Sequence, residues 1–257
     1  MAEPASSGVP LIAIEGLEKA APGLPTLRVR RLVIRAGDRV TIRGVDAGAA
    51  EALVHLMTGA ALPDTGEVRM AGRRTTDVGT DMEWLTALDR FGIVTERAVL
   101  LDGLSRAANL ALPMTLDVDP IPDDVRARVG DLARLVGLDE ATLDARAVNL
   151  TPLDRMRMHL ARALAVGPEA LLLEHPTAAL DPATSRAFGE ALRRAADARH
   201  LAWVVFADDD AFADAAGGRR GRLDLTTGEW TEDRQGFWRR LSKIFGTKAS
   251  KTTKGSL

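Results

Sequence analysis

The chain has no cysteine and no tyrosine, and its 257 residues include four tryptophans and six phenylalanines. The lack of cysteine excludes disulfides and thiolate metal sites and is consistent with a reducing compartment. No apolar run approaches the roughly 18 residues that a membrane-spanning helix needs. Residues 1–10 lack the basic and apolar regions of a signal peptide. We therefore expect a cytoplasmic protein.

A strong charge of either sign is also missing. The net charge is −2, with 46% hydrophobic and 27% charged residues, a composition typical of globular domains. No overall positive field would attract nucleic acid, so we expect no nucleic-acid partner. The length suits one large domain, or one domain with an additional lobe.

Hydrophobic periodicity predicts an α/β fold. Residues 11–14, 27–34 and 39–43 have strand character, and the apolar residues of 52–57 have helical spacing that ends at Gly59. Short apolar runs at 171–173 and 203–206 are typical of parallel strands covered on both faces. Residues 97–160 are mostly helical by their spacing. Alternating strands and helices indicate the α/β class with a helical insertion near 97–150.

Several segments at the ends of these elements carry a recognisable order of residues. They are Gly44-Val45-Asp46-Ala47-Gly48-Ala49-Ala50-Glu51, Phe91-Gly92-Ile93-Val94-Thr95-Glu96, Leu150-Thr151-Pro152-Leu153-Asp154, Leu171-Leu172-Leu173-Glu174-His175-Pro176-Thr177-Ala178-Ala179-Leu180-Asp181 and Val205-Phe206-Ala207-Asp208. In this order they resemble the phosphate loop (Walker A), Q-loop, signature, Walker B with D-loop, and switch motifs of the ATP-binding cassettes of ABC transporters.

The resemblance covers residues 11–230 and implies a P-loop NTPase-like cassette with a mostly parallel core sheet, N-terminal antiparallel strands and a helical insertion. The expected domains are a flexible N-terminus (1–10), a cassette core (11–96 and 156–230), a helical lobe (97–155) and a basic amphipathic tail (231–257). It also implies ATP and magnesium as cofactors, a transmembrane transporter subunit as partner, and a homo- or heterodimer with another cassette.

The phosphate-loop segment departs from the pattern G-x-x-x-x-G-K-[ST]. Gly44 and Gly48 are present, but Ala49 replaces the second glycine of the pattern, Ala50 the lysine and Glu51 the magnesium-binding hydroxyl residue. We expect Ala49 to hinder a positive-φ geometry. We expect Glu51 to lie in the first turn of the helix, with its negative charge where phosphate would sit.

The other nucleotide-facing positions are also altered. The resemblance makes Glu96 the Q-loop residue, and the lack of tyrosine leaves no counterpart for the aromatic residue that stacks on adenine in the family. In the signature, Thr151 is expected to cap a helix with Pro152 as its first residue and Asp154 in its first turn. Pro152 has no N–H to offer a phosphate, and Asp154 would repel one.

Glu174 and His175 replace the Asp-Glu pair of Walker B, and Asp208 replaces the switch histidine. Glu174 could hold magnesium, and His175 could accept a proton from water. A structural pair between His175 and Asp208 is the favoured alternative, and a metal cluster that also includes Asp209 is a third. The resemblance assigns Asp181, the D-loop aspartate, a contact across a cassette dimer.

These substitutions predict a cassette that is catalytically impaired and acts as a structural or regulatory partner of a membrane transport complex, docking beside Glu96 and the helical lobe. Two alternatives stay open. One is an active ATPase of a divergent transporter, with lipid or lipoprotein export suggested by Asn109-Leu110-Ala111-Leu112-Pro113; the other is a soluble adaptor. The impaired reading depends on the carboxylates of Glu51 and Asp154 having no cation to offset them.

The last segment has a basic amphipathic pattern. Its apolar and basic residues alternate at helical spacing, as in Phe237, Trp238, Arg239, Arg240, Leu241 and Lys243. Such a helix can lie on an anionic membrane surface, which would place the protein at the inner face of the cell membrane. Packing of this helix on its own domain is the alternative.

Overall fold

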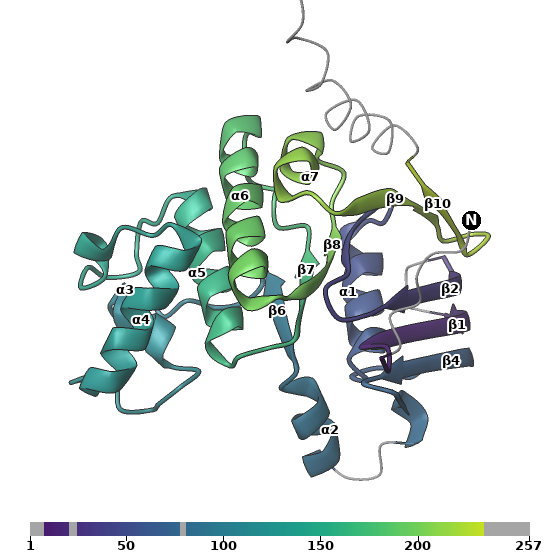
Figure 1. Cartoon of the computed structure of the whole chain (residues 1–257), viewed down its shortest axis with the longest axis horizontal. Helices are drawn as coiled ribbons and strands as arrows, with labels where there is room; N and C mark the ends of the chain where they lie inside the picture. The colour runs from purple at the N-terminus through teal and green to yellow at the C-terminus, as the bar shows by residue number, and fades with distance from the viewer. Residues whose placement is uncertain (1–7, 21–24, 78–80, 234–257) are drawn as a thin grey trace, which may run out of the picture.

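The computed structural model describes residues 8–20, 25–77 and 81–233, in which two sheets are joined by helices (Figure 1). The predicted membrane-facing residues 237–243 lie outside the described residues, as do residues 1–7 of the predicted N-terminal segment. Within the described ranges, no helix combines the length and apolar character needed to cross a bilayer.

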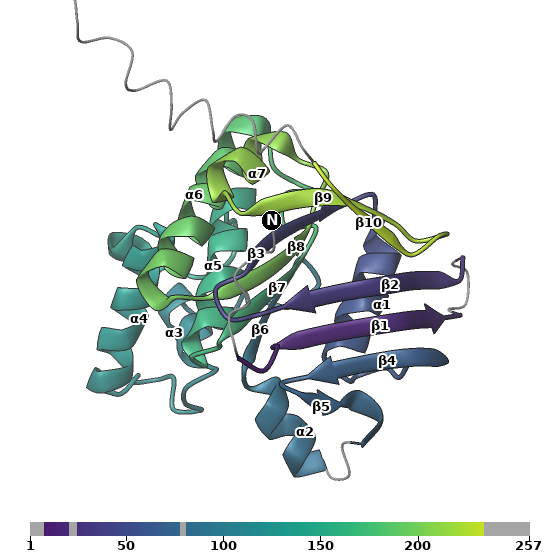
Figure 2. The same ribbon diagram turned by 45° about the vertical axis from the view of Figure 1, so that its right-hand side comes forward.

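The smaller sheet is antiparallel and has the order β2-β1-β4-β5 (Figure 2). Its strands are β1 (Ile12–Lys19), β2 (Leu27–Ile34), β4 (Thr65–Met70) and β5 (Arg73–Arg74). Alternate residues of β1 and β2 are buried, as a half-exposed sheet requires. β1 continues five residues beyond the predicted 11–14, past a register shift between Glu15 and Glu18 that interrupts its alternation.

The larger sheet has the order β10-β9-β3-β8-β7-β6, and all its neighbouring strands are parallel except β10 and β9. The strands are β3 (Arg39–Arg43), β6 (Phe91–Thr95), β7 (Ala170–Glu174), β8 (Ala202–Phe206), β9 (Arg219–Asp224) and β10 (Glu229–Glu232). Every residue of β7 and β8 is buried, which confirms the prediction from their short apolar runs. Residues 231 and 232, predicted to begin the tail, belong to β10.

The two faces of the larger sheet pack against different layers. Leu172 and Val204 face α1 (Ala47–Met57), which lies between this sheet and the smaller one. Leu171 and Leu173 face the opposite way, into a core shared with the helices. Successive side chains of a strand point to opposite faces of the sheet, so a strand that is apolar throughout contributes apolar side chains to the cores on both faces.

Helices cover that second face, and those between β6 and β7 form the lobe at the left of Figure 1. They are α3 (Arg106–Ala111), α4 (Asp123–Val136), the 3-10 helix η2 (Glu140–Thr142), α5 (Pro152–Ala165), α6 (Pro182–Arg199) and α7 (Asp210–Ala216). The helical insertion is thus confirmed. The 3-10 helix η1 (Thr75–Asp77) and α2 (Asp81–Leu88) precede β6 and were not predicted.

Candidate functional site

The predicted phosphate loop is helical over most of its length. α1 begins at Ala47, because Asp46 caps it: Asp46 Oδ1 accepts the Ala49 N–H at 2.8 Å, and the Asp46 carbonyl accepts the Ala50 N–H at 2.8 Å. Ala49 therefore lies in α1 with helical backbone, and the positive-φ geometry that an alanine was expected to hinder is not present at this position. Ala50, at the lysine position, is fully buried. Two amides at the start of α1 are thus committed to Asp46.

The early start of α1 changes the place of Glu51. Glu51 lies in the second turn, so the prediction that its carboxylate occupies the first turn and stabilises the helix start is wrong. Its Oε2 instead forms an ion pair with Arg97 Nη1. Arg97 lies in the loop that follows β6.

The same guanidinium also binds the carboxylate at the end of β7. Arg97 Nη2 donates to Glu174 Oε2, and the Glu174 side chain is 8% exposed while Arg97 is 47% and Glu51 40% exposed. Arg97 thus bridges a half-exposed and a buried carboxylate. The expectation that Glu51 has no cation to offset it is wrong, and Arg97 is a site residue that the sequence analysis missed. Its neighbour Glu96, the Q-loop position, is exposed.

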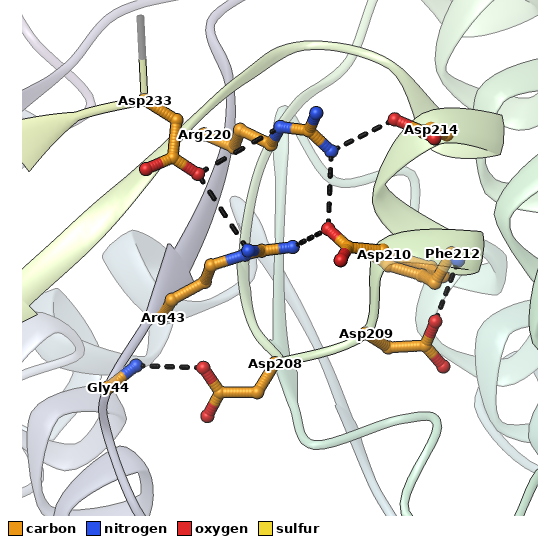
Figure 3. A network of polar contacts seen from close by, with 9 residues as sticks. All are labelled: Arg43, Gly44, Asp208, Asp209, Asp210, Phe212, Asp214, Arg220 and Asp233. Atoms are coloured by element: carbon orange, nitrogen blue, oxygen red, sulfur yellow. Dashed lines mark hydrogen bonds and ion pairs between the residues drawn. The ribbon is translucent and has the colours of Figure 1, made fainter. Parts of the chain in front are cut away.

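His175 and Asp208 do not form the predicted pair. Both line an open hollow of about 600 Å³ with Asp209 and Asp210, but Asp208 Oδ1 instead accepts the Gly44 N–H at 3.1 Å (Figure 3). The backbone N–H of His175 donates to the Phe206 carbonyl, and the buried ring atom Nε2 of His175 has no hydrogen-bond partner.

A metal cluster at this hollow is also not formed. In the described part of the chain, no group of three or more His, Asp or Glu side chains is arranged to hold a metal ion. The third alternative for these residues, a cluster of Glu174, His175, Asp208 and Asp209, is therefore not formed. The carboxylate of Glu174, the single residue predicted as a magnesium ligand, faces Arg97 instead.

One of the acids that line the hollow, Asp210, belongs to an ion-pair network with two arginines (Figure 3). Arg43 pairs with Asp210, and Arg220 Nη1 lies 3.6 Å from Asp210 Oδ1 and 2.9 Å from Asp214 Oδ1. Asp233, the last described residue, has Oδ2 3.8 Å from Arg43 Nη1 and 3.9 Å from Arg220 Nε. This network fixes the start of α7 against the end of β3 and the start of β9.

The signature segment is a capped helix start, as predicted. Thr151 Oγ1 accepts the Asp154 N–H at 3.1 Å and donates to Asp154 Oδ2 at 2.9 Å, and Pro152 is the first residue of α5. Arg157 Nη1 lies 3.3 Å from Asp154 Oδ1. The expectation that Asp154 has no offsetting cation is therefore wrong as well.

The D-loop aspartate also caps a helix. Asp181 Oδ1 accepts the Thr184 N–H at 3.0 Å and the Ala183 N–H at 2.8 Å, at the start of α6. These hydrogen bonds, that from Thr184 first, lower the pKa of Asp181 below its usual value. Its role across a cassette dimer stays a prediction.

Comparison with known proteins agrees with the fold. No family model matches the chain. It is 30% identical over 176 residues to the methionine import ATP-binding protein MetN 1 of Salmonella choleraesuis, covering 68% of this chain and 50% of the relative. It is 33% identical over 162 residues to MetN of Escherichia coli K12, covering 63% and 46%. The chain thus spans about half the length of the curated relatives it matches.

Solved structures show the same architecture. The dimeric, ADP- and phosphate-bound ATP-binding cassette MJ0796 superposes with a TM-score of 0.70 at 22% identity, covering 86% of this chain and 97% of that one. CbiO1 of Clostridium perfringens, part of the ABC transporter complex cbiONQ, gives 0.73 at 17% identity, covering 93% and 96%. The chain has the ATP-binding-cassette fold.

Proposed function

We propose that the chain is the cassette subunit of an ABC-type membrane transport complex and acts there as a structural or regulatory partner that hydrolyses ATP weakly or not at all. The transport half of this proposal is supported by the likeness to import ATP-binding proteins and to CbiO1. It implies a transmembrane subunit and a second cassette as partners, and a place at the cytoplasmic face of the membrane. The two MetN relatives are named as import ATP-binding proteins, which gives no support to the export alternative.

The impaired half is carried by one observation: the Arg97 guanidinium lies between the carboxylates of Glu51 and Glu174. By the family resemblance, these two positions face the magnesium ion of a hydrolytic cassette. A guanidinium is permanently charged and offers only N–H donors, so it cannot coordinate a phosphate oxygen or a water molecule as a Lewis acid. It occupies the two carboxylates without supplying Lewis-acid chemistry.

The phosphate-binding groups give the same indication. Asp46 and Asp208 accept hydrogen bonds from the Ala49 and Gly44 N–H groups, so carboxylates of the chain itself lie beside the amides that would face a phosphate. Ala50 is buried and supplies no cation. The residues present therefore do not fit magnesium and ATP, and we derive no hydrolytic step.

Magnitudes favour a large loss of activity. Removing a single preorganised donor to a transition state typically costs about 10²–10³ in rate. Here the lysine, the magnesium-binding hydroxyl, the catalytic carboxylate and the switch histidine are all replaced. Their effects do not multiply in full, because such residues act as a unit. The remaining hydrolysis should still be close to background.

The test is nucleotide binding and turnover by the purified full chain. Calorimetry with magnesium and ATP, and a phosphate-release assay, are run beside a hydrolytic cassette as positive control. We expect no saturation in the micromolar range and no phosphate release above the protein-free rate. Micromolar affinity with turnover would reject the impaired role and establish the alternative, an active ATPase that uses Glu174 and His175.

A further inference from the structure

We infer that Arg97 is a resident cation in the place of a bound metal, and that it fixes the loop after β6 in one conformation without any nucleotide. The inference rests on the proposed function, since it concerns the same site in a cassette that does not turn over ATP. Arg97 is here a positioning residue: it acts on the loop by holding α1 and the end of β7 together.

Arg97 attaches the loop to two different elements of the core. Its two terminal nitrogens bind different carboxylates, Nη1 that of Glu51 and Nη2 that of Glu174. Because Glu174 is 8% exposed, its charge requires a partner, and Arg97 is its one ion-pair partner in the described part of the chain. A single side chain from the loop therefore links helix α1 to strand β7.

The loop is also held further along. Arg162 on α5 donates to the Val99 carbonyl at 2.6 Å. Asn109 on α3 is fully buried, and it accepts the Leu101 N–H at 2.8 Å and donates to the Leu101 carbonyl at 3.0 Å. With Arg97 at one end and Asn109 at the other, residues 97–101 are attached to the core sheet and to the helical lobe.

This attachment has a consequence for how the loop meets a partner. Val99 and Leu101 are 70% and 46% exposed although the backbone at both residues is fixed. The loop therefore presents two apolar side chains in set positions, and the entry or loss of a nucleotide is not needed to arrange them.

If Arg97 replaces a metal ion, a second effect is expected when it is removed. Removing the guanidinium frees two carboxylates that had shared one cation. Carboxylate oxygens are ligands that suit a divalent ion such as magnesium. Magnesium should then bind weakly at Glu51 and Glu174 and partly replace Arg97. A purely structural arginine gives no reason for that response.

The experiment is amide hydrogen exchange of the full chain, read in peptides that cover residues 96–104, with and without millimolar magnesium chloride. In Arg97→Ala we expect exchange at least about tenfold faster than in the wild type, because an attachment of the loop is lost. Magnesium alone should slow it part of the way back. In the wild type, neither magnesium nor magnesium with ATP should change the exchange.

Arg90→Ala is the matched control, because Arg90 forms a two-point ion pair with the exposed carboxylate of Glu169, away from this loop. It should leave residues 96–104 unchanged. If Arg97→Ala does not fold, the double variant Arg97→Ala/Glu174→Gln removes the unpaired buried charge. That variant should show the fast exchange and no magnesium response.

Wild-type exchange rates in Arg97→Ala, or the absence of any magnesium effect on it, would overturn the inference. Both of these readouts on Arg97→Ala come from protein without nucleotide. ATP turnover by the wild type would therefore reject the proposed function without altering the Arg97→Ala result. A negative Arg97→Ala result would leave the turnover test unaffected.

Discussion

Asp208 Oδ1 accepts a hydrogen bond from the backbone N–H of Gly44 at 3.1 Å, although 164 positions separate the two residues in the chain. This contact joins the end of β8 to the end of β3, immediately before α1. A carboxylate thereby accepts the hydrogen bond from a backbone amide that, by the family resemblance, would donate to a phosphate. The switch position and the phosphate-loop position are linked to each other directly, without a ligand between them.

Substitution of Asp208 tests the contribution of that bond. Asp208→Ala leaves the Gly44 N–H without its partner, and we expect the free energy of unfolding to fall by about 0.5–1.5 kcal/mol. Asp208→Asn keeps an oxygen acceptor and removes the charge, so it should lose less. Chemical denaturation of the three proteins gives the comparison; equal stability of Ala and Asn variants would show that the bond contributes nothing.

The second prediction concerns the buried carboxylate of Glu174. Arg97→Met leaves that carboxylate without its cation, which typically costs about 3–5 kcal/mol. Arg97→Met/Glu174→Gln should recover much of the loss, because no uncompensated charge then remains. Arg90→Met, which breaks a surface pair, should cost about 0–1 kcal/mol. Denaturant titration distinguishes these outcomes, and similar losses in both single arginine variants would contradict the prediction.

The third prediction concerns Gly44 itself. Its φ is +77°, and a Cβ there would lie 2.8 Å from Arg222 Nη1 and 3.3 Å from the Leu223 carbonyl oxygen. Gly44→Ala should therefore destabilise the fold by about 1–3 kcal/mol. Adding Arg222→Ala removes the movable neighbour but neither the backbone strain nor the Leu223 contact, so it should restore only part of the stability. Full recovery of the thermal stability in the double variant would mean that the positive φ of residue 44 does not destabilise the alanine variant.

Much of the fold follows from local sequence. β7 and β8 are apolar throughout because both faces of the sheet are covered, and the Thr151–Asp154 cap is a contact between residues three positions apart. β9 was not predicted because Arg219, Arg220 and Arg222 give it no apolar pattern; its pairing with β3 and β10 makes it a strand.

The contacts of the site depend instead on residues that are distant in sequence. Glu174 and Arg97 lie 77 positions apart, and nothing near Arg97 indicates which way a loop side chain points. The resemblance identified Glu51, Glu174 and Asp208 as the positions to inspect. It gave the wrong partner for Asp208 and none for the two glutamates, since partners depend on the tertiary arrangement.

The last prediction is a pH dependence of stability that arises at His159. This side chain on α5 is 2% exposed, and neither ring nitrogen has a hydrogen-bond partner. Burial, with Arg162 and Arg155 adding repulsion, lowers the pKa of His159 from 6.5 to about 4. The unfolded chain therefore binds this proton more readily than the folded chain does, and the free energy of unfolding falls as pH decreases from about 6.5 to about 4.

Between pH 7 and pH 5 this effect amounts to about 2 kcal/mol, since each pKa unit corresponds to about 1.4 kcal/mol. His159→Leu keeps an apolar side chain of similar size in the core and removes the titrating group, so its stability should change less over the same range. Denaturation of both proteins at a series of pH values gives the difference. Parallel pH profiles would show that the folded protein accommodates the charged imidazole, in conflict with a dry, unpartnered site.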